Sequence, residues 1–470
     1  MIRTLTALVV IGCACKGGTH QPPPPAADPW GAPAATVAET PAARKQRAEK
    51  ALARVADIMP KLAKLRGLAF DRDVPREYQS AADFRVFVRG EIANELPAPQ
   101  AADTSAALFH IGLMNRPGNL AALEEQALTT QAGAYYDPQK KKFFLVMVPP
   151  TDLMLDTMSS HELTHALQDQ HFDLDTYMPR GPAPGASDAL DADHQTARRF
   201  VAEGDATFTM FLYALGSFGK EITPGMVKLM RAQLDQFATM SPEDMMRQNL
   251  LAMSAELDPE LQTSLAGLAN IPSTVLVPMF DSYLRGSQLI ATAYDRGGWK
   301  AVDALYTDPP ESTEQVLHPT TKLYPERDHP KTVTIAPLPH GTQIASLVFG
   351  ELQWQVYFQL WLPAQKAIAS EGWGGDRATV TRTDDGRLVA RLATVWDTVD
   401  DANELRAAYV ASLATRFPKG SGDPSSARGF ERGDGAGTIY LVQRGAAVFI
   451  VDGADNRTVL DDLVAATQIR

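Results

Sequence analysis

The sequence predicts a mainly helical domain with a small β-hairpin, followed by a smaller α+β domain. Apolar residues recur at helical spacing over most of residues 44–290, and strand-like runs alternate with helical ones after about His340. A composition of 45% hydrophobic and 21% charged residues is ordinary for a globular protein. We therefore expect a helical domain over residues 46–335 and an α+β domain over residues 340–470.

The N-terminal residues predict a leader peptide. Met1-Ile2-Arg3 is a short basic start, a short apolar run follows, and Val10-Ile11-Gly12-Cys13 matches a lipobox. The pattern resembles that of bacterial lipoproteins, which implies that residues 1–12 are a signal peptide and that Cys13 carries the lipid anchor. The chain is then expected in the bacterial cell envelope, anchored to a membrane and facing the periplasm or the cell exterior. The alternative is a cytosolic start that contains two cysteines by chance.

Residues 13–45 are expected to form the lipid anchor and a tether, because Pro22-Pro23-Pro24-Pro25 opens a Pro- and Ala-rich stretch. The chain has one cysteine besides Cys13, which is Cys15. Disulfides between folded elements and thiolate ligands for a metal are therefore excluded. The net charge of −12 argues against nucleic acid as a partner.

In the helical domain, the apolar pattern predicts several helices and one hairpin. Two aromatic-rich runs around Asp137-Pro138 indicate strands over residues 134–148. Such a hairpin either packs on the core like any other or presents an edge that aligns an extended peptide. Further helices are expected over residues 47–65 with a break near Pro60, over 120–131, over 225–237, and from about 278–286 to Gly297-Gly298.

The C-terminal domain is expected to mix helices and strands. The predicted elements are a helix over residues 347–362, a turn over 372–376, strands over 378–382 and 388–396, a helix over 402–416, strands over 438–442 and 447–452, and a helix over 455–466. The glycines of the turn precede a strand rather than open a helix, so they do not form a phosphate-binding loop. The domain either packs against the helical domain or recognises a partner.

The strongest chemical signal is the motif His161-Glu162-Leu163-Thr164-His165. It follows Pro149-Pro150-Thr151-Asp152, which ends one segment and caps the next, and it lies in a helix of roughly 20 residues. Residues four apart share a helix face, so His161 and His165 can bind one metal ion. Glu162 can then take a proton from water and pass it to a leaving amine. An accidental match is expected in on the order of one such chain in a hundred.

Two residues compete for the third metal ligand. His171 follows His161 by the ten positions found in metzincin-type enzymes, but Gln168 stands where those enzymes place a glycine that turns the chain back. If the helix continues, His171 lies roughly 240° from His165 around its axis. Glu203 is favoured, because it lies in an apolar helical run and is followed by the small residues Gly204 and Ala206, which permit a close approach. The alternative for Glu203 is a solvated surface position.

His161-Glu162-x-x-His165 and Glu203-Gly204-Asp205-Ala206 together resemble the gluzincin superfamily of zinc metallopeptidases, whose aminopeptidase branch has a similar Glu-Gly-x-Ala. The resemblance covers two helices. It implies a zincin-like fold, a Zn²⁺ ion bound by His161, His165 and Glu203, and Glu162 as the catalytic base. The chain departs from thermolysin-like enzymes in the 38 positions between His165 and Glu203, and in Thr207, where those enzymes carry an Asp behind a zinc ligand. Residues 179–193 are expected to form a surface loop that borders the cleft.

A third segment, Tyr306 to Pro319, resembles a stretch of uncharacterised bacterial proteins that also carry the metal motif. A hydrolase needs a donor for the developing oxyanion, and His318, Tyr306 or Tyr324 can provide it. The alternative for His318 is a structural role in a Pro-rich loop.

These observations predict a membrane-anchored zinc-dependent metallopeptidase that acts on a peptide or protein substrate. Two alternatives stay open: a surface lipoprotein with a structural metal site, and a zinc amidase that acts on the cell wall. A structural zinc site needs a fourth protein ligand, whereas catalysis needs an open position. No further His or Cys stands at useful helical spacing, which favours catalysis.

Overall fold

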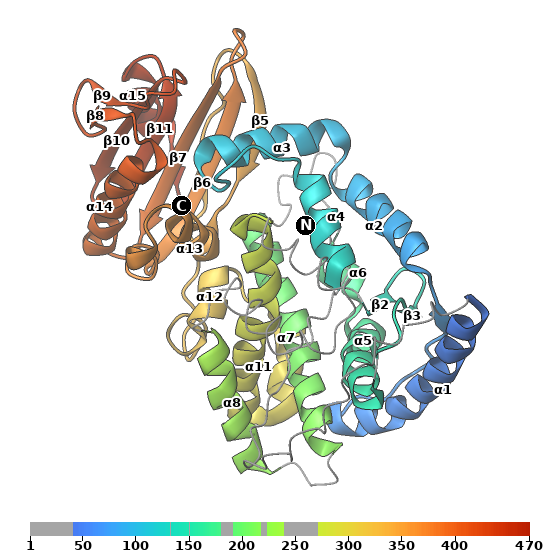
Figure 1. Ribbon diagram of the computed structural model, residues 1–470. Helices are drawn as coiled ribbons and strands as arrows, with labels where there is room; N and C mark the ends of the chain where they lie inside the picture. Colours follow the sequence, from blue (N-terminus) through green and yellow to red (C-terminus); the bar gives the residue numbers. More distant parts are fainter. Residues whose placement is uncertain (1–40, 132, 150, 180–190, 218–222, 239–270) are drawn as a thin grey trace, which may run out of the picture.

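The computed structural model describes residues 41–131, 133–149, 151–179, 191–217, 223–238 and 271–470. Helices dominate the N-terminal part, and a seven-stranded antiparallel sheet dominates the C-terminal part (Figure 1). The predicted mixture of a helical region and a later α+β region is therefore confirmed. The predicted signal peptide, Cys13, most of the tether and most of the predicted 179–193 loop lie outside the described residues.

The N-terminal part consists of helices and a small sheet. Its helices are α1 (Pro41–Arg66), α2 (Ala81–Glu95), α3 (Ala98–Ile111), α4 (Leu120–Gln131), α5 (Asp152–Phe172), α6 (Leu174–Tyr177), α7 (Ala192–Gly216), α8 (Pro224–Ala238), α11 (Ser273–Thr307) and α12 (Thr313–Leu317), followed by the π-helical turn Pro319–Leu323. Its strands β1 (Arg76–Tyr78), β2 (Ala134–Asp137) and β3 (Lys142–Leu145) form a sheet in the order β1-β3-β2. β2 and β3 are the predicted hairpin, and β1 adds to it in parallel. No described helix has the length and apolar character needed to cross a membrane.

The C-terminal part is built on one large sheet. Its strands are β5 (Thr342–Leu347), β6 (Trp373–Arg382), β7 (Leu388–Trp396), β8 (Ser421–Asp423), β9 (Gly429–Glu431), β10 (Thr438–Arg444) and β11 (Ala447–Ala454), in the spatial order β5-β6-β7-β11-β10-β9-β8. Its helices are α13 (Gly350–Trp361), a 3₁₀ turn (Pro363–Gln365), α14 (Val399–Arg416) and α15 (Thr458–Ala466). The short strands β4 (Val333–Thr334) and β12 (Gln468–Ile469) pair with each other.

The two faces of the large sheet have different covers, because successive side chains of a strand point to opposite faces. One face packs into the main core with α13 and α14, through residues such as Leu392 and Ile450. The other face packs under α15 and β4, through residues such as Val389 and Val451. We call this second face the α15 face.

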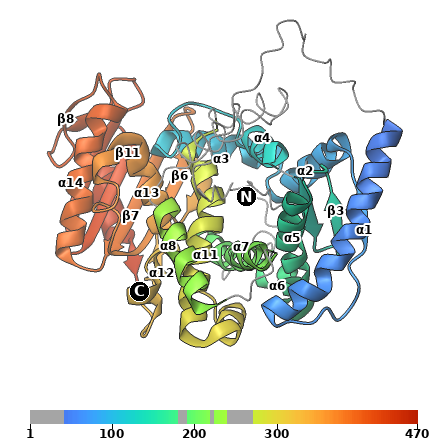
Figure 2. The same ribbon diagram turned by 60° about the horizontal axis from the view of Figure 1, so that its bottom comes forward.

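α7 lies between α5 and α11 (Figure 2). It crosses α11 where Gly204 meets Gly286, and a Cβ atom on Gly204 would lie 2.2 Å from the carbonyl carbon of Gly286. Only two glycines permit this approach of the two backbones. The crossing therefore fixes where the residues next to Gly204 stand.

Three predictions of local structure are wrong. α1 does not break near Pro60, since residues on both sides of it, Val55 and Leu62, are buried in the same core. The predicted turn over 372–376 begins β6, because Gly375 permits the backbone of Lys331 to cross the strand: a Cβ there would lie 2.3 Å from the carbonyl oxygen of Lys331. For the predicted helix over 347–362 only the start is wrong: α13 begins at Gly350, because Leu347 is still part of β5.

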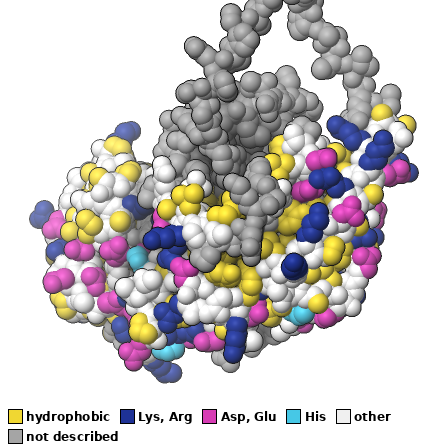
Figure 3. All heavy atoms as spheres, turned by 90° about the horizontal axis from the view of Figure 1, so that it is seen from below, with side chains coloured by type: hydrophobic (Ala, Val, Ile, Leu, Met, Phe, Trp, Pro, Cys, Tyr) yellow, Lys and Arg dark blue, Asp and Glu magenta, His cyan; other side chains and the backbone are white. Residues whose placement is uncertain are grey.

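On the face seen from below in Figure 3, acidic and basic side chains of the described residues alternate with apolar ones. The described part of this face is therefore mixed in charge, with no large region of one sign.

Candidate metal centre

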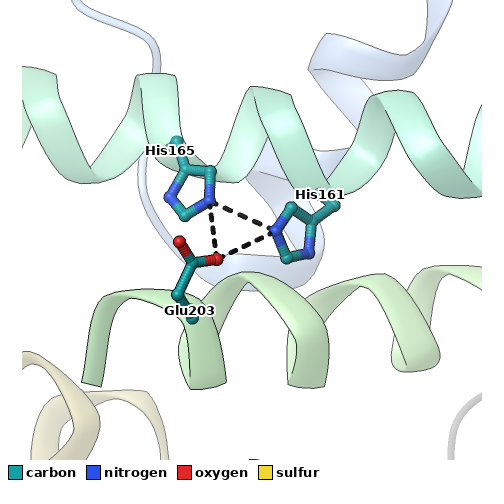
Figure 4. A group of neighbouring side chains, drawn as sticks. All are labelled: His161, His165 and Glu203. Carbon is teal, nitrogen blue, oxygen red and sulfur yellow. Dashed lines mark hydrogen bonds and ion pairs between the residues drawn. The ribbon is translucent and has the colours of Figure 1, made fainter. Parts of the chain in front are cut away.

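α5 presents the two motif histidines side by side. Thr151 begins the helix by accepting a hydrogen bond from the backbone N–H of Met154, and the helix continues without a break to Phe172. His161 and His165 are both buried, and their Nε2 atoms lie 3.2 Å apart (Figure 4). Both imidazoles therefore point at one place beside α5.

α7 delivers Glu203 to the same place. Its Oε2 lies 3.3 Å from Nε2 of His161 and 3.4 Å from Nε2 of His165 (Figure 4). The next residue is Gly204, so the close crossing of α7 with α11 fixes where along α5 the carboxylate meets the histidines. The structure thus brings together the three residues that the sequence singled out as ligands.

The three ligand atoms have the spacing that a tetrahedral zinc ion requires. Zinc bonds of about 2.0–2.1 Å at tetrahedral angles place neighbouring ligand atoms about 3.3 Å apart. The measured separations are 3.2, 3.3 and 3.4 Å. Two imidazole nitrogens and one carboxylate oxygen are also a ligand set that zinc favours. Among the described residues, the group contains no fourth His, Cys, Asp or Glu, so one tetrahedral position remains for water or substrate.

The side chain of Gln168 orients His165. The Nδ1–H of His165 donates to Oε1 of Gln168 at 2.8 Å, which leaves Nε2 as the atom that faces the cluster. Nε2 of Gln168 donates to the carbonyl of Ala202 at 2.9 Å and to Asp205 at 3.2 Å. One amide group therefore ties a histidine of α5 to the backbone and side chains of α7.

Asp205 is the centre of a buried polar network. Arg66 donates to both of its carboxylate oxygens, from Nε at 2.8 Å and from Nη2 at 3.1 Å. The hydroxyl of Tyr306 donates to Oδ2 at 2.8 Å. Arg66 and Asp205 have no exposed side-chain surface, so the network is part of the core. Through Asp205 it also contacts the amide nitrogen of Gln168.

Charges in the metal-free cluster are strongly coupled. Burial lowers the pKa of His161 to about 4. Burial also acts to lower the pKa of His165, but the Glu203 carboxylate outweighs it and raises that pKa to about 9. Burial would raise the pKa of Glu203, whereas His165 lowers it well below its usual range. A cation bound by these three residues would replace the proton that His165 and Glu203 otherwise share.

Glu162 is fully buried beside the cluster. Its Oε2 accepts the backbone N–H of Tyr136 in β2 at 3.1 Å, whereas Oε1 has no hydrogen-bond partner among the described residues. Burial raises the pKa of Glu162 well above its usual range, although His165 opposes that shift. One oxygen is thus held in place, and the other is available to a molecule at the site.

Two of the predicted oxyanion donors, Tyr306 and Tyr324, contact other groups in the described part of the chain. The hydroxyl proton of Tyr306 is directed at Asp205, because that buried carboxylate needs donors. The ring of Tyr324 lies under the guanidinium of Arg296, 4.3 Å from it. A direct role of these two residues in catalysis therefore stays a prediction.

His318 pairs with a glutamate of α13. Its Nε2 lies 2.9 Å from Oε1 of Glu351, and this hydrogen bond raises the pKa of His318. Tyr283 of α11, in contrast, lies against His161, with ring centroids 5.9 Å apart. No contact of His318 with the three ligands is found among the described residues, so its role as the donor stays a prediction.

Sequence reasoning missed Tyr283, which is buried and whose ring meets the edge of His161 at 65°. Nothing in its local sequence marks it, because only the crossing of α11 with α7 brings it to the motif helix. His171 takes the position expected for a continuous helix: its Nε2 lies 2.7 Å from the carbonyl of Ala69, away from the other histidines.

A second group of carboxylates, Glu314, Asp328 and Asp397, lies around the ammonium group of Lys322. Nζ of Lys322 is 3.0 Å from Glu314 and 2.7 Å from Asp328, and it also contacts Asp397. The lysine therefore already supplies the positive charge that these residues need, and they are not a metal site.

Comparison with known proteins gives one match. Residues 338–463 match a family described as a domain of unknown function, DUF8575, which corresponds to the large C-terminal sheet with its helices. No curated protein and no solved structure matches the chain.

Proposed function

We propose that this chain is a zinc-dependent hydrolase of peptide bonds, with a helical domain of the zincin type and a metal centre of the gluzincin kind. The observation that carries the proposal is the convergence of His161, His165 and Glu203 with tetrahedral spacing next to the half-free carboxylate of Glu162. Zinc bound there acts as a Lewis acid that makes water nucleophilic near neutral pH.

Glu162 is the general base in this proposal. Its Oε2 is fixed by the N–H of Tyr136, so Oε1 is the oxygen that takes a proton and later returns it to the leaving amine. Burial favours the protonated carboxyl, but a cation held by the neighbouring ligands would favour the ionised form. Tyr283, beside His161, is the described aromatic residue best placed to line the reaction site.

The position of β2 supports a peptide as the substrate. β2 is an edge strand of its sheet, and its residue Tyr136 contacts Glu162 directly. An extended peptide can align with an edge strand through main-chain hydrogen bonds, which would place its scissile bond near Glu162.

We propose further that the chain is a lipoprotein of the bacterial cell envelope, anchored through Cys13. The lipobox at residues 10–13 and the Pro-rich stretch after it support this part of the proposal. Labelling of the expressed protein with a fatty acid, compared with Cys13→Ser, tests it: label on both proteins, or on neither, would contradict an anchor at Cys13.

The hydrolase proposal is tested with the purified mature chain and a mixed peptide library, with and without a chelator. We expect cleavage by the wild type that disappears with the chelator and with Glu162→Gln, while Glu162→Gln retains one zinc per chain. Glu203→Gln should lose both zinc and activity. His171→Ala is the matched control, since this histidine lies on the same helix but outside the cluster, and it should cleave normally.

Other outcomes would reject the proposal. If the wild type holds zinc but cleaves no peptide, and instead hydrolyses amide bonds of purified cell wall in a Glu162-dependent manner, the chain is a cell-wall amidase. If it holds zinc and cleaves neither, the centre is structural.

A further inference from the structure

Arg391 is a buried arginine of β7 that has no anionic partner within the described ranges of the chain. The residue is 5% exposed and lies on the α15 face of the large sheet. Nε and Nη2 are enclosed and have no hydrogen-bond partner in the described part of the chain. A buried charge without a counterion is costly, so such a group normally has one.

The other buried arginines of the described residues each have a carboxylate partner. Arg66 donates from Nε and Nη2 to Asp205, and Arg432 pairs with Asp452 at 2.7 Å. Burial lowers the pKa of Arg391, and no carboxylate acts against that effect. Arg391 therefore has the same nitrogen edge that Arg66 uses for a carboxylate, but this edge contacts no carboxylate of the described residues.

Two threonine hydroxyl groups next to Arg391 are also buried without a hydrogen-bond partner in the described part of the chain. Thr379 of β6 stands directly opposite Arg391 in the sheet register, and Thr381 follows two positions later on the same face. Both are 2% exposed, and the Oγ1 of each is enclosed without a hydrogen-bond partner among the described residues. Directly opposed residues have their Cβ atoms about 5 Å apart, so the hydroxyl of Thr379 is within reach of a small group bound to the guanidinium.

The residues that pack against this face are apolar. α15 contributes the apolar residues Leu460 and Leu463, and the segment before β5 contributes Ile335 and Leu338. An apolar cover would leave the guanidinium and both hydroxyls unsatisfied unless a small polar species lies between them.

We propose that Arg391, Thr379 and Thr381 form a binding site for a small oxyanion, with phosphate as the favoured species, inside the domain that matches the family of unknown function. The Nε–Nη2 edge of Arg391 binds two oxygens of the anion side by side, as such edges bind carboxylate or phosphate. The two threonine hydroxyls donate to the remaining oxygens, which phosphate provides in greater number than a carboxylate does. This site is independent of the metal centre.

The test is the binding of inorganic phosphate to the full mature chain at constant ionic strength, with a chelator present so that phosphate does not act at the metal centre. Equilibrium dialysis should find one phosphate per chain, and phosphate should raise the melting temperature by several degrees relative to chloride. Arg391→Met should abolish both effects. Arg387→Met is the matched control, because this partly exposed arginine of the β6–β7 turn is paired with Asp385 and Asp455, and it should bind phosphate normally.

Thr379→Val tests the site without removing its charge, should Arg391→Met fail to fold. It should weaken phosphate binding about tenfold, as expected for the loss of a hydrogen bond to a charged group. Acetate in place of phosphate distinguishes the anions: an equal response would make the ligand a carboxylate. The absence of bound phosphate and acetate in the wild type, or equal binding by wild type and Arg391→Met, would overturn the proposal.

Discussion

Oε1 of Gln168 lies 2.8 Å from Nδ1 of His165, one helical turn after the motif. An amide oxygen only accepts, so this contact selects the imidazole tautomer that carries its proton on Nδ1 and presents a lone pair at Nε2. Because the amide nitrogen of Gln168 is held by Ala202 and Asp205, the orientation of a residue on α5 depends on α7.

The first prediction concerns this contact. Gln168→Ala should weaken zinc binding by roughly 10- to 100-fold, the usual cost of losing the group that orients a metal-bound histidine. Competition with a chromogenic chelator measures the affinity. Gln170→Ala, on the same helix but bonded to Arg72, should bind zinc as the wild type does. Equal affinities of Gln168→Ala and the wild type would show that the amide does not support the metal centre.

The second prediction concerns the buried ion pair behind Gln168. Asp205→Asn leaves the fully buried Arg66 with Asp303 alone, and it should lower the free energy of unfolding by about 3–5 kcal/mol. Asp303→Asn is the comparison. Asp303 is 32% exposed and makes one contact with Arg66, so its loss should cost about 1 kcal/mol or less. Urea unfolding measures the free energy of unfolding of both variants. Similar decreases in the two would contradict the interpretation that Asp205 is the main counterion of Arg66.

The third prediction concerns the crossing of α7 and α11. A Cβ at position 286 would lie 2.4 Å from the carbonyl oxygen of Phe200 and 2.9 Å from Cα of Gly204. Gly286→Ala must therefore move the helices apart, which should cost about 1–3 kcal/mol of stability. It should also weaken zinc binding, since Glu203 precedes the contact.

Gly90→Ala is the control for this substitution. A Cβ at position 90 in α2 would meet nothing within 4 Å, so alanine should raise stability by about 0.5–1 kcal/mol through its helix propensity. The same loss of stability in both variants would mean that the crossing is not tightly packed.

The parts of the site that could be predicted from the sequence depend on local periodicity. His161 and His165 share a helix face because they are four residues apart, and the apolar run around Glu203 indicates a helix that can approach them. Gln168 could not be recognised in the same way, since its role depends on contacts with residues 34 and 37 positions away.

The oxyanion donors were predicted from residue type alone, and residue type does not reveal the partners of a side chain. Tyr306 donates to Asp205 and His318 pairs with Glu351, contacts that depend on residues far away in the sequence. In the C-terminal part, the glycines at the start of β6 were predicted as a turn because local sequence does not reveal that Lys331 crosses the strand there.

The last prediction concerns the pH dependence of stability. Asp376 is buried and accepts hydrogen bonds from the N–H of Phe349 at 2.8 Å and from the indoles of Trp373 at 2.7 Å and Trp354 at 3.1 Å. Burial raises its pKa from 3.8 to about 6 in spite of these three donors. Between about pH 4 and pH 6, the folded chain therefore binds a proton that the unfolded chain has released.

The sign of the effect follows from linkage. A group with a raised pKa stabilises the folded state at low pH, and this contribution is lost as the pH rises from about 4 to about 6. Each tenfold change in proton affinity corresponds to about 1.36 kcal/mol, so a rise in pKa from 3.8 to about 6 makes this loss about 3 kcal/mol. Asp376→Asn cannot titrate, so the difference in unfolding free energy between wild type and variant should fall by about this amount from pH 4 to pH 7. Urea unfolding followed by tryptophan fluorescence measures it, since two of the donors are indoles. A difference that stays constant with pH would mean that Asp376 ionises in the folded chain as it does in the unfolded one.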